Sequence, residues 1–509
     1  FSSILFLFLY LPIVLFIYHL LFFPVSRGWQ VSFWRRACNL FLLSVSLLFY
    51  FWGENFLLWI VITSTLIDYF CGLLIAGGFS RKPLIRLRRK IKRTGVQKAG
   101  LIFSICSNLA FLGFFKYFNF GIDNFNSLMG SLNLTALQWN DAAQITLPLG
   151  ISFYTFQSMS YTIDVYRGKV RATRNLIDFS CYVTMFPQLV AGPIVRYKDV
   201  ARQLVHRVIT TEKFASGISR FVVGLGKKVI IANTVALPAD QIFALPAQDI
   251  SAPLAWIGLL CYTLQIYFDF SGYSDMAIGL GRMFGFEFLE NFNYPYIARS
   301  IQEFWRRWHI SLSSWFRDYL YIPLGGNQCS TFRTYFNLVT VFFLCGLWHG
   351  ASWAFAVWGL YHGMFLVIER MGFSSVLKRT WSPARHLYTL LVAMVGWVFF
   401  RADTLTYAID FLTAMSGLGP ADPRIYPVGA YCSLHVALAL VLGVIGSAPI
   451  LPAINRWVAA ARAESTNPLP SVLYGGYQIL SLTGLCLIML MVAMSLALGA
   501  YNPFIYFRF

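Results

Sequence analysis

The chain has 509 residues, of which 58% are hydrophobic and only 12% are charged. Soluble domains carry about 25% charged residues, so this composition excludes an ordinary soluble protein. The net charge of +19 does not indicate nucleic-acid binding, because the Lys and Arg residues lie in short segments between apolar runs, as in the cytoplasmic loops of membrane proteins. Apolar stretches of about twenty residues recur along the chain, and each is long enough to cross a bilayer. The sequence predicts an all-α, polytopic helical membrane protein that contacts anionic lipid headgroups.

The first apolar stretch, 1–23, is predicted to be a membrane span because it has neither a basic start nor a cleavage site with small residues. Two further spans follow at 39–52 and 56–77. Residues 81–98 carry nine Lys or Arg, which places this loop in the cytoplasm. We expect it to bind lipid headgroups; a docking surface for an acidic donor or carrier is the alternative.

Charge alternates through the next spans, at 100–118 and 145–163. The segment 119–144 between them contains no Lys or Arg, whereas the two segments on either side of 179–195 are basic. Both flanks of 179–195 are therefore predicted to be cytoplasmic. This segment is broken by Pro and Gly, and irregular backbone is tolerated at membrane depth only where protein or a water-filled cavity surrounds it. We predict a re-entrant hairpin beside a cavity.

Spans at 214–235 and from 254 onward enclose an outer loop at 236–253 that has no Lys or Arg. The second span carries Asp269 and Asp275, which are either functional or, as we favour, partners of a helix end or a nearby Arg. The GLG sequences at 224–226 and 279–281 lie in apolar helical sequence. They indicate close helix packing and not a phosphate-binding loop.

The most informative stretch begins at Ser300. As one helix it places Ile301, Trp305, Trp308, Leu312, Trp315 and Tyr319 on one face, and Gln302, Arg306, His309, Ser313 and Arg317 on the other. Such a helix lies at the membrane boundary, with His309 on its polar side. Glu303 and Arg307 are four residues apart and can form an ion pair.

An apolar run then leads to Trp348-His349-Gly350, and a return run ends at Glu369-Arg370. Spans at 386–401, 428–450 and 471–499 complete a prediction of eleven or twelve spans. Together with re-entrant and interfacial helices they are expected to surround a central funnel or tunnel. We find no repeat or linker, which indicates a single membrane domain over 1–509.

Ionisable groups at membrane depth are functional candidates by default, and the chain has only seven His. His349 and His309 are the leading candidates for chemistry, and His362 is a candidate for a supporting role. No HExxH motif, zinc-ligand spacing or GxSxG motif accompanies them. The sequence therefore predicts chemistry by a neutral imidazole, with no metal and no tightly bound cofactor.

Three motifs make the chain recognisable: QEFWRRWHISLS at 302–313, DYLYIPLGGN at 318–327 and GLWHG at 346–350. They resemble the membrane-bound O-acyltransferase (MBOAT) family, and more narrowly its bacterial branch of alginate O-acetyltransferases. The likeness extends over almost the whole chain, including FDFSGYSD at 268–275 and YNPF at 501–504.

The resemblance implies that His349 is the catalytic residue and that His309 occupies the second polar position of the family. It also implies an acetyl group donated by acetyl-CoA or an acylated carrier protein, and a hydroxyl acceptor on an exopolysaccharide such as alginate or cellulose, or on a periplasmic relay protein. A bacterial inner-membrane location follows. We expect the substrates to contact Trp305, Arg306, Arg307, Trp308, Trp348 and His362.

Two non-enzymatic functions are the alternatives to acyl transfer. A transporter of the polysaccharide would show inverted repeats and paired intramembrane charges, which the sequence does not suggest. A non-catalytic scaffold in the export complex would keep assembling its partners without either histidine.

Overall fold

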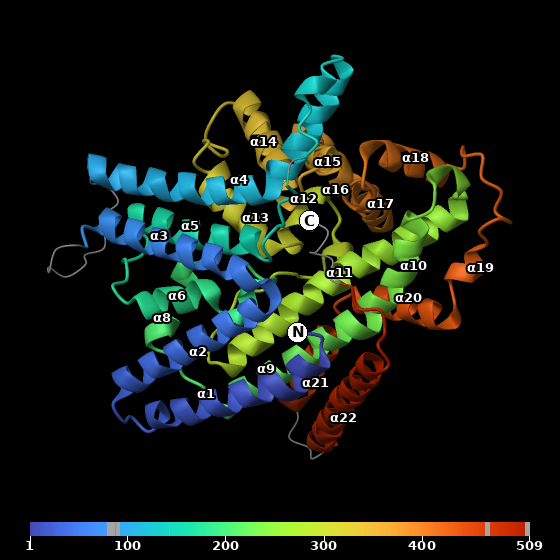
Figure 1. Cartoon of the computed structure of the whole chain (residues 1–509). Helices are drawn as coiled ribbons and strands as arrows, with labels where there is room; N and C mark the ends of the chain where they lie inside the picture. Colours follow the sequence, from blue (N-terminus) through green and yellow to red (C-terminus); the bar gives the residue numbers. More distant parts are fainter. Residues whose placement is uncertain (79–86, 88–91, 142, 464–468, 504–509) are drawn as a thin grey trace.

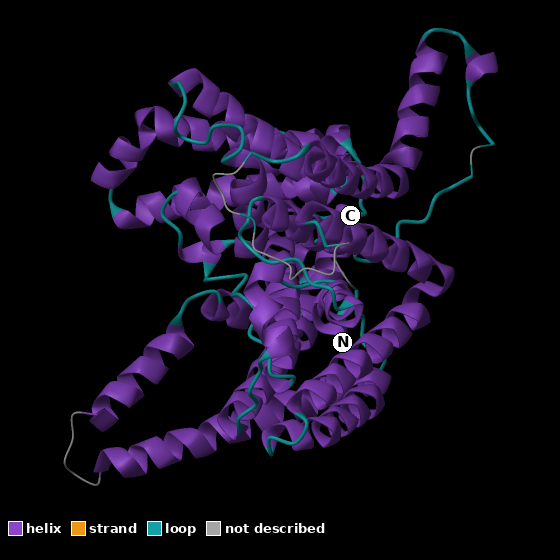
Figure 2. Cartoon of the chain, turned by 90° about the vertical axis from the view of Figure 1, so that its left-hand side faces the viewer, coloured by secondary structure: helices purple, strands orange, loops and turns teal. Residues whose placement is uncertain are grey.

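The computed structural model describes residues 1–78, 87, 92–141, 143–463 and 469–503. Every regular element in this part of the chain is a helix (Figure 2). The all-α, polytopic fold class is therefore confirmed. Most of the predicted basic loop at 81–98 lies outside the described residues.

Twenty-two α-helices follow one another in the described residues (Figure 1). The first eleven are α1 (Leu11–Ser26), α2 (Val31–Glu54), α3 (Leu58–Ala76), α4 (Gly95–Ser131), α5 (Ile151–Tyr166), α6 (Leu176–Thr184), α7 (Phe186–Leu189), α8 (Tyr197–Val205), α9 (Thr211–Gly226), α10 (Asn233–Phe243) and α11 (Ala252–Met283). The others are α12 (Ile301–Arg307), α13 (Ile310–Phe316), α14 (Thr331–His349), α15 (Trp353–Ile368), α16 (Ser374–Arg379), α17 (Ser382–Arg401), α18 (Leu405–Met415), α19 (Val428–Tyr431), α20 (Leu434–Gly446), α21 (Ile450–Ala463) and α22 (Leu469–Ala497).

Seven helical stretches of the described residues are long and apolar enough to cross a membrane, or eight if the bent pair of α20 and α21 forms one span. One of the seven, Val31–Ala76, contains both α2 and α3. The number is lower than the predicted eleven or twelve. A main reason is that α5 and α15, where the sequence predicts spans, have only 16 residues each.

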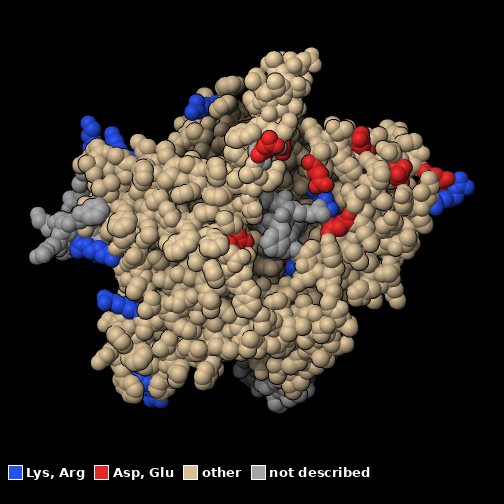
Figure 3. All heavy atoms as spheres, viewed as in Figure 1, with Lys and Arg blue, Asp and Glu red and all other residues tan. Residues whose placement is uncertain are grey.

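Charged side chains separate toward two ends of the molecule. Arg35 of α2 donates to Val205 O, and Arg167 and Arg196 both donate to Asp318, at 2.8 and 2.6 Å. The segments 27–36, 167–174 and 196–213 therefore meet at one end, here called the basic end. In Figure 3 most visible Lys and Arg lie on the left, whereas the visible Asp and Glu lie toward the centre and right. This segregation fits the predicted alternation of loops across a bilayer.

The predicted break at 179–195 is present. Helix α6 ends at Thr184, the four-residue α7 follows, and the chain returns through irregular backbone to α8. Its buried amides are hydrogen-bonded by side chains: Phe186 N donates to Ser46 Oγ at 3.0 Å, and Ile194 N donates to Ser311 Oγ at 2.9 Å. These hydroxyls satisfy backbone groups that no helix partner reaches.

Helices α9 and α11 cross in very close contact at two pairs of glycines. A Cβ placed on Gly224 would lie 2.6 Å from Gly272 O, and one on Gly279 would lie 2.6 Å from Gly217 O. The GLG sequences therefore serve close helix packing, as predicted.

The two carboxylates of α11 are paired with cations. Asp275 has the Arg partner predicted from the sequence, whereas the partner of Asp269 is a Lys and α11 is not broken there. Asp269 lies 2.8 Å from Lys228 Nζ, and both side chains are 1% exposed. Asp275 contacts Arg220 at 2.6 Å and Lys227 at 2.7 Å. Buried charges of this kind require partners because no water solvates them.

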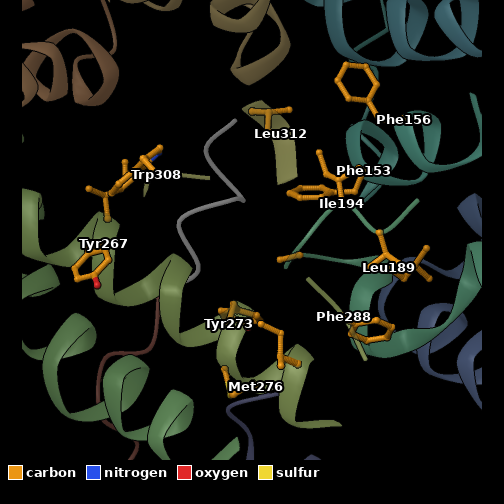
Figure 4. Packing of buried hydrophobic residues seen from close by; sticks show 14 of the residues in the cluster. Phe153, Phe156, Leu189, Ile194, Tyr267, Tyr273, Met276, Phe288, Trp308 and Leu312 are labelled. Carbon is orange, nitrogen blue, oxygen red and sulfur yellow. The ribbon is translucent and has the colours of Figure 1, made fainter. Parts of the chain in front are cut away.

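The core forms where α5, the re-entrant segment and α11 converge with the helices around residue 309. Figure 4 shows side chains of these elements packed together, including Phe153, Phe156, Leu189, Ile194, Tyr267, Trp308 and Leu312. Gly150 precedes α5 with φ +77, and a Cβ there would lie 2.3 Å from Leu189 O. Glycine at this position lets α5 begin directly against α7.

Candidate active site

The predicted single helix from Ser300 is interrupted at its histidine. Helix α12 ends at Arg307, and α13 begins at Ile310. His309 between them has φ 43 and ψ 55, a left-handed conformation. The break turns its side chain into the interior, where it is 1% exposed. The prediction of one continuous helix with His309 on the polar face beside Arg306 is therefore wrong.

His309 is held by Asn291, in the irregular segment before α12. Asn291 Oδ1 lies 3.1 Å from His309 Nδ1 and also accepts from Ser311 Oγ at 2.8 Å. The Asn291 amide nitrogen donates to Ser274 Oγ at 3.0 Å. These contacts fix the amide orientation, so His309 Nδ1 is the donor and Nε2 carries the free lone pair. Nε2 is buried and has no hydrogen-bond partner among the described residues.

His349 is the last residue of α14, at the tip of the hairpin formed by α14 and α15. The two helices meet at glycines: a Cβ on Gly346 would lie 2.3 Å from Phe355 O, and one on Gly359 would lie 2.3 Å from Phe342 O. This close crossing of the helix backbones fixes the position of His349, three residues after Gly346 on α14.

Helix α4 satisfies the carbonyls at the end of α14. Lys116 Nζ donates to Trp348 O at 2.5 Å and to His349 O at 2.9 Å. The Tyr117 hydroxyl donates to Leu347 O. The last carbonyls of a helix lack intrahelical partners, and a cation there is favoured by the helix dipole.

His349 lies on the wall of a cavity of about 320 Å³. The loop before α5 and Glu54, the last residue of α2, also line it. The opposite ends of α2 and α5 lie at the basic end, so the cavity lies away from that end. Its lining residues are Glu54, Lys116, Thr146, Leu147, Pro148, Leu149, Gly150, Ile151, Ser152, Phe153, Val190, Trp348 and His349. A second cavity of about 360 Å³ shares Glu54, Leu149 and Val190 with it.

The structure brings His349 and His309 together, with ring centroids 6.5 Å apart. Trp348 contacts both, at 5.0 Å from the His349 ring and 6.2 Å from the His309 ring. His362 lies further away in an aromatic cluster: Trp358 is 5.1 Å from His349 and 5.2 Å from His362.

Both nitrogens of His362 are buried without a hydrogen-bond partner among the described residues. Trp305 packs 5.0 Å from the His362 ring, and Trp308 packs 4.8 Å from Trp397. Of the predicted substrate-contacting residues, only Trp348 lines the cavity of His349.

The two arginines of the motif lie apart from the imidazoles. Arg306 is exposed. Arg307 forms the predicted ion pair with Glu303, at 2.9 Å, and also donates to Asn293 O at 3.1 Å. The pair stabilises α12.

Lys116, Glu54 and Asn291 were not singled out from the sequence. Lys116 offered a signal, since it is the one Lys within the predicted span at 100–118. Asn291 offered none, because an Asn in irregular backbone is common. Among the described residues, no group of three or more His, Cys, Asp or Glu is placed to hold a metal ion.

Comparison of the sequence with known proteins places the chain in a family. The sequence profile of the MBOAT, membrane-bound O-acyltransferase family matches residues 169–406, which include both histidines. The probable alginate O-acetylase AlgI of Azotobacter vinelandii is 42% identical over 100% of both chains. The corresponding protein of Pseudomonas aeruginosa is 48% identical over 82% of this chain and 75% of its own.

A more distant relative is the peptidoglycan O-acetyltransferase of Helicobacter pylori. It is 36% identical over 75% of this chain and 74% of its own. The family match, the extent of these similarities and the apolar helices agree with one another. The chain belongs to the membrane-bound O-acyltransferase family and is a multi-pass membrane O-acyltransferase.

Proposed function

We propose that this protein transfers an acetyl group from a thioester donor at the basic end to a hydroxyl acceptor that enters the cavity of His349. The observation that carries the proposal is the position of His349, on the wall of that cavity and 6.5 Å from the His309 ring. The alginate and peptidoglycan O-acetylases among its relatives support acetyl as the group transferred and an exopolysaccharide pathway as its setting.

In the proposed reaction His349 is the general base. It takes the proton from the acceptor hydroxyl while that oxygen bonds to the thioester carbonyl carbon. The tetrahedral intermediate then collapses, the carbon–sulfur bond breaks, and the imidazolium returns the proton to the leaving thiolate. Base assistance of this kind contributes about 10²–10⁴-fold to a rate. Apolar rings around His349 favour its neutral, proton-accepting form.

The donor we propose is acetyl-CoA or an acylated carrier protein, approaching from the basic end. Exposed Arg306 is suited to attract its phosphates, and His309 to orient its acyl group. The proposed acceptor is a sugar hydroxyl of the polysaccharide or a hydroxyl on a periplasmic relay protein. A bacterial inner-membrane location follows from this pairing.

The test is acetyl transfer by membranes that contain the wild type or the His349→Ala variant, measured as thiol release from acetyl-CoA and as acetyl content of the polysaccharide. We expect the variant to accumulate normally and to lose transfer. Wild-type transfer by His349→Ala would refute the assignment. Continued polymer export without any thiol release by the wild type would instead favour the transporter or scaffold.

A further inference from the structure

Lys116 is a buried cation in an apolar helix. Its neighbours in α4 are Phe114, Phe115, Tyr117 and Phe118, and it is 8% exposed. A charged side chain at membrane depth is costly and marks a functional position by default. The mechanism proposed above does not use it.

The ammonium group has more hydrogen-bonding capacity than the helix end requires. An ammonium carries three N–H donors, and two of them are directed to the carbonyls of Trp348 and His349. The nearest further acceptor is Ser152 Oγ, at 3.5 Å. Lys116 and Ser152 both line the cavity of His349, so the third donor lies at the cavity wall.

The charge of Lys116 is balanced by dipoles. Among the described residues its partners are two carbonyls and one hydroxyl, with no carboxylate in ion-pair range. The C-terminal end of α14 supplies about half a negative charge. Lys116 therefore presents its charge to the cavity next to the imidazole, and Glu54, a carboxylate that also lines the cavity, forms no ion pair with it.

We propose that Lys116 is a catalytic residue that stabilises the oxyanion formed on the carbonyl oxygen of the transferred acyl group. This inference rests on the proposed acetyl transfer. When the acceptor oxygen bonds to the carbonyl carbon, the π electrons of the carbonyl move to its oxygen, and the third N–H of Lys116 stabilises the oxyanion. When the tetrahedral intermediate collapses, the carbonyl forms again and the carbon–sulfur bond breaks. The thiolate leaves and receives the proton from the His349 imidazolium. His309 does not line this cavity, and among the described residues Lys116 is the one Lys or Arg that does.

Three variants separate this role from capping of the helix. Lys116→Met removes charge and donors. Lys116→Gln removes the charge and keeps two amide N–H donors, enough only for the two carbonyls of the helix end. Lys116→Arg keeps the charge and the additional donors. Loss of one oxyanion donor lowers kcat by about 10²–10³-fold. We expect that loss in the Met and Gln variants with KM for acetyl-CoA unchanged, because the interaction forms only in the transition state. Lys116→Arg should retain more activity than either.

Tyr117→Phe is the matched control, because it removes a neighbouring cap of the same helix end and Tyr117 does not line the cavity. It should keep kcat within a few fold. Wild-type kcat in Lys116→Gln, or equal losses in Tyr117→Phe and Lys116→Gln, would overturn the proposal. So would failure of both neutral variants to fold, since capping would then explain the residue. His349→Ala is assayed in parallel. If it loses transfer while the Lys116 variants keep it, only the role of Lys116 is refuted; if it keeps wild-type transfer, the proposed function itself is refuted.

Discussion

Asn291 Oδ1 lies 3.1 Å from Nδ1 of His309, and this contact determines which nitrogen of the ring can accept a proton. The amide also holds Ser311, whose hydroxyl accepts from Ile194 N of the re-entrant segment. The Asn291 side chain thus connects the His309 ring, through Ser311, to the backbone of the re-entrant segment. The tautomer of His309 is set by the same contacts that hold the re-entrant segment in place.

Replacement of Asn291 by Leu should lower acetyl transfer although Asn291 lies outside the cavity. The Leu side chain cannot accept from Nδ1, so His309 loses its fixed tautomer. We expect about a 10–100-fold lower rate, comparable to the loss of an outer partner of a functional His. His309→Ala should be at least as severe. Thiol-release kinetics compare the two, and an unchanged rate in His309→Ala would show that the ring is only structural.

A methyl group at Gly346 should displace His349. The added Cβ would lie 2.3 Å from Phe355 O, which belongs to backbone and cannot rotate away. Gly346→Ala is expected to force α14 and α15 apart and to lower activity by at least about tenfold, since misplacement by 1 Å can cost 10²-fold. Gly113→Ala in α4 is the control, because nothing lies within 4 Å of its new Cβ. Equal activity in both variants would contradict the prediction.

The Lys228–Asp269 pair should behave as a buried ion pair. Lys228→Met removes the lysine partner of the Asp269 carboxylate, whose side chain is 1% exposed. Removal of one partner of such a buried pair typically lowers the free energy of unfolding by about 3–5 kcal/mol. Equilibrium unfolding in mixed detergent measures the loss. Lys227→Met should cost much less, because Lys227 is 24% exposed and Asp275 keeps Arg220. The double variant Lys228→Met/Asp269→Leu should recover part of the stability.

Asp318 should give the basic end a pH-dependent stability. Burial alone would raise the pKa of Asp318, but hydrogen bonds and charges from Arg317 and Arg196 outweigh it and hold this pKa below its ordinary value of 3.8. A carboxylate whose pKa is lowered by folding stabilises the protein above its ordinary pKa, and the effect disappears as the pH falls through the lower, folded value.

The wild type should therefore melt at a higher temperature than Asp318→Asn at pH 7, and the difference should shrink below pH 4. Thermal melting in detergent across this range measures it. A difference that stays constant with pH would contradict the assignment.

The sequence predicted those features that depend on local pattern. Hydropathy identified the membrane helices, the Pro and Gly residues around 187–193 identified the re-entrant break, and the spacing of Glu303 and Arg307 identified their ion pair. It could not predict the break at His309, because the stretch follows a continuous 3.6-residue period on both sides of it. The break is instead accompanied by contacts of Asn291, 18 residues earlier in irregular backbone, with the His309 ring and with Ile310 N.

Other features missed by the sequence analysis depend on contacts between distant segments. Lys116 reaches the end of α14 across 233 positions, and no local pattern reports such a partner.

The left-handed backbone of His309 limits which amino acids evolution or an engineer can place at this position. Among residues other than glycine, Asn, Asp and His adopt that conformation most readily, whereas a β-branched side chain there would be strained by about 1–3 kcal/mol. The side chains that the backbone tolerates best at φ 43 are thus polar ones able to form hydrogen bonds. The backbone conformation and the chemistry of the site therefore favour the same residue types at position 309.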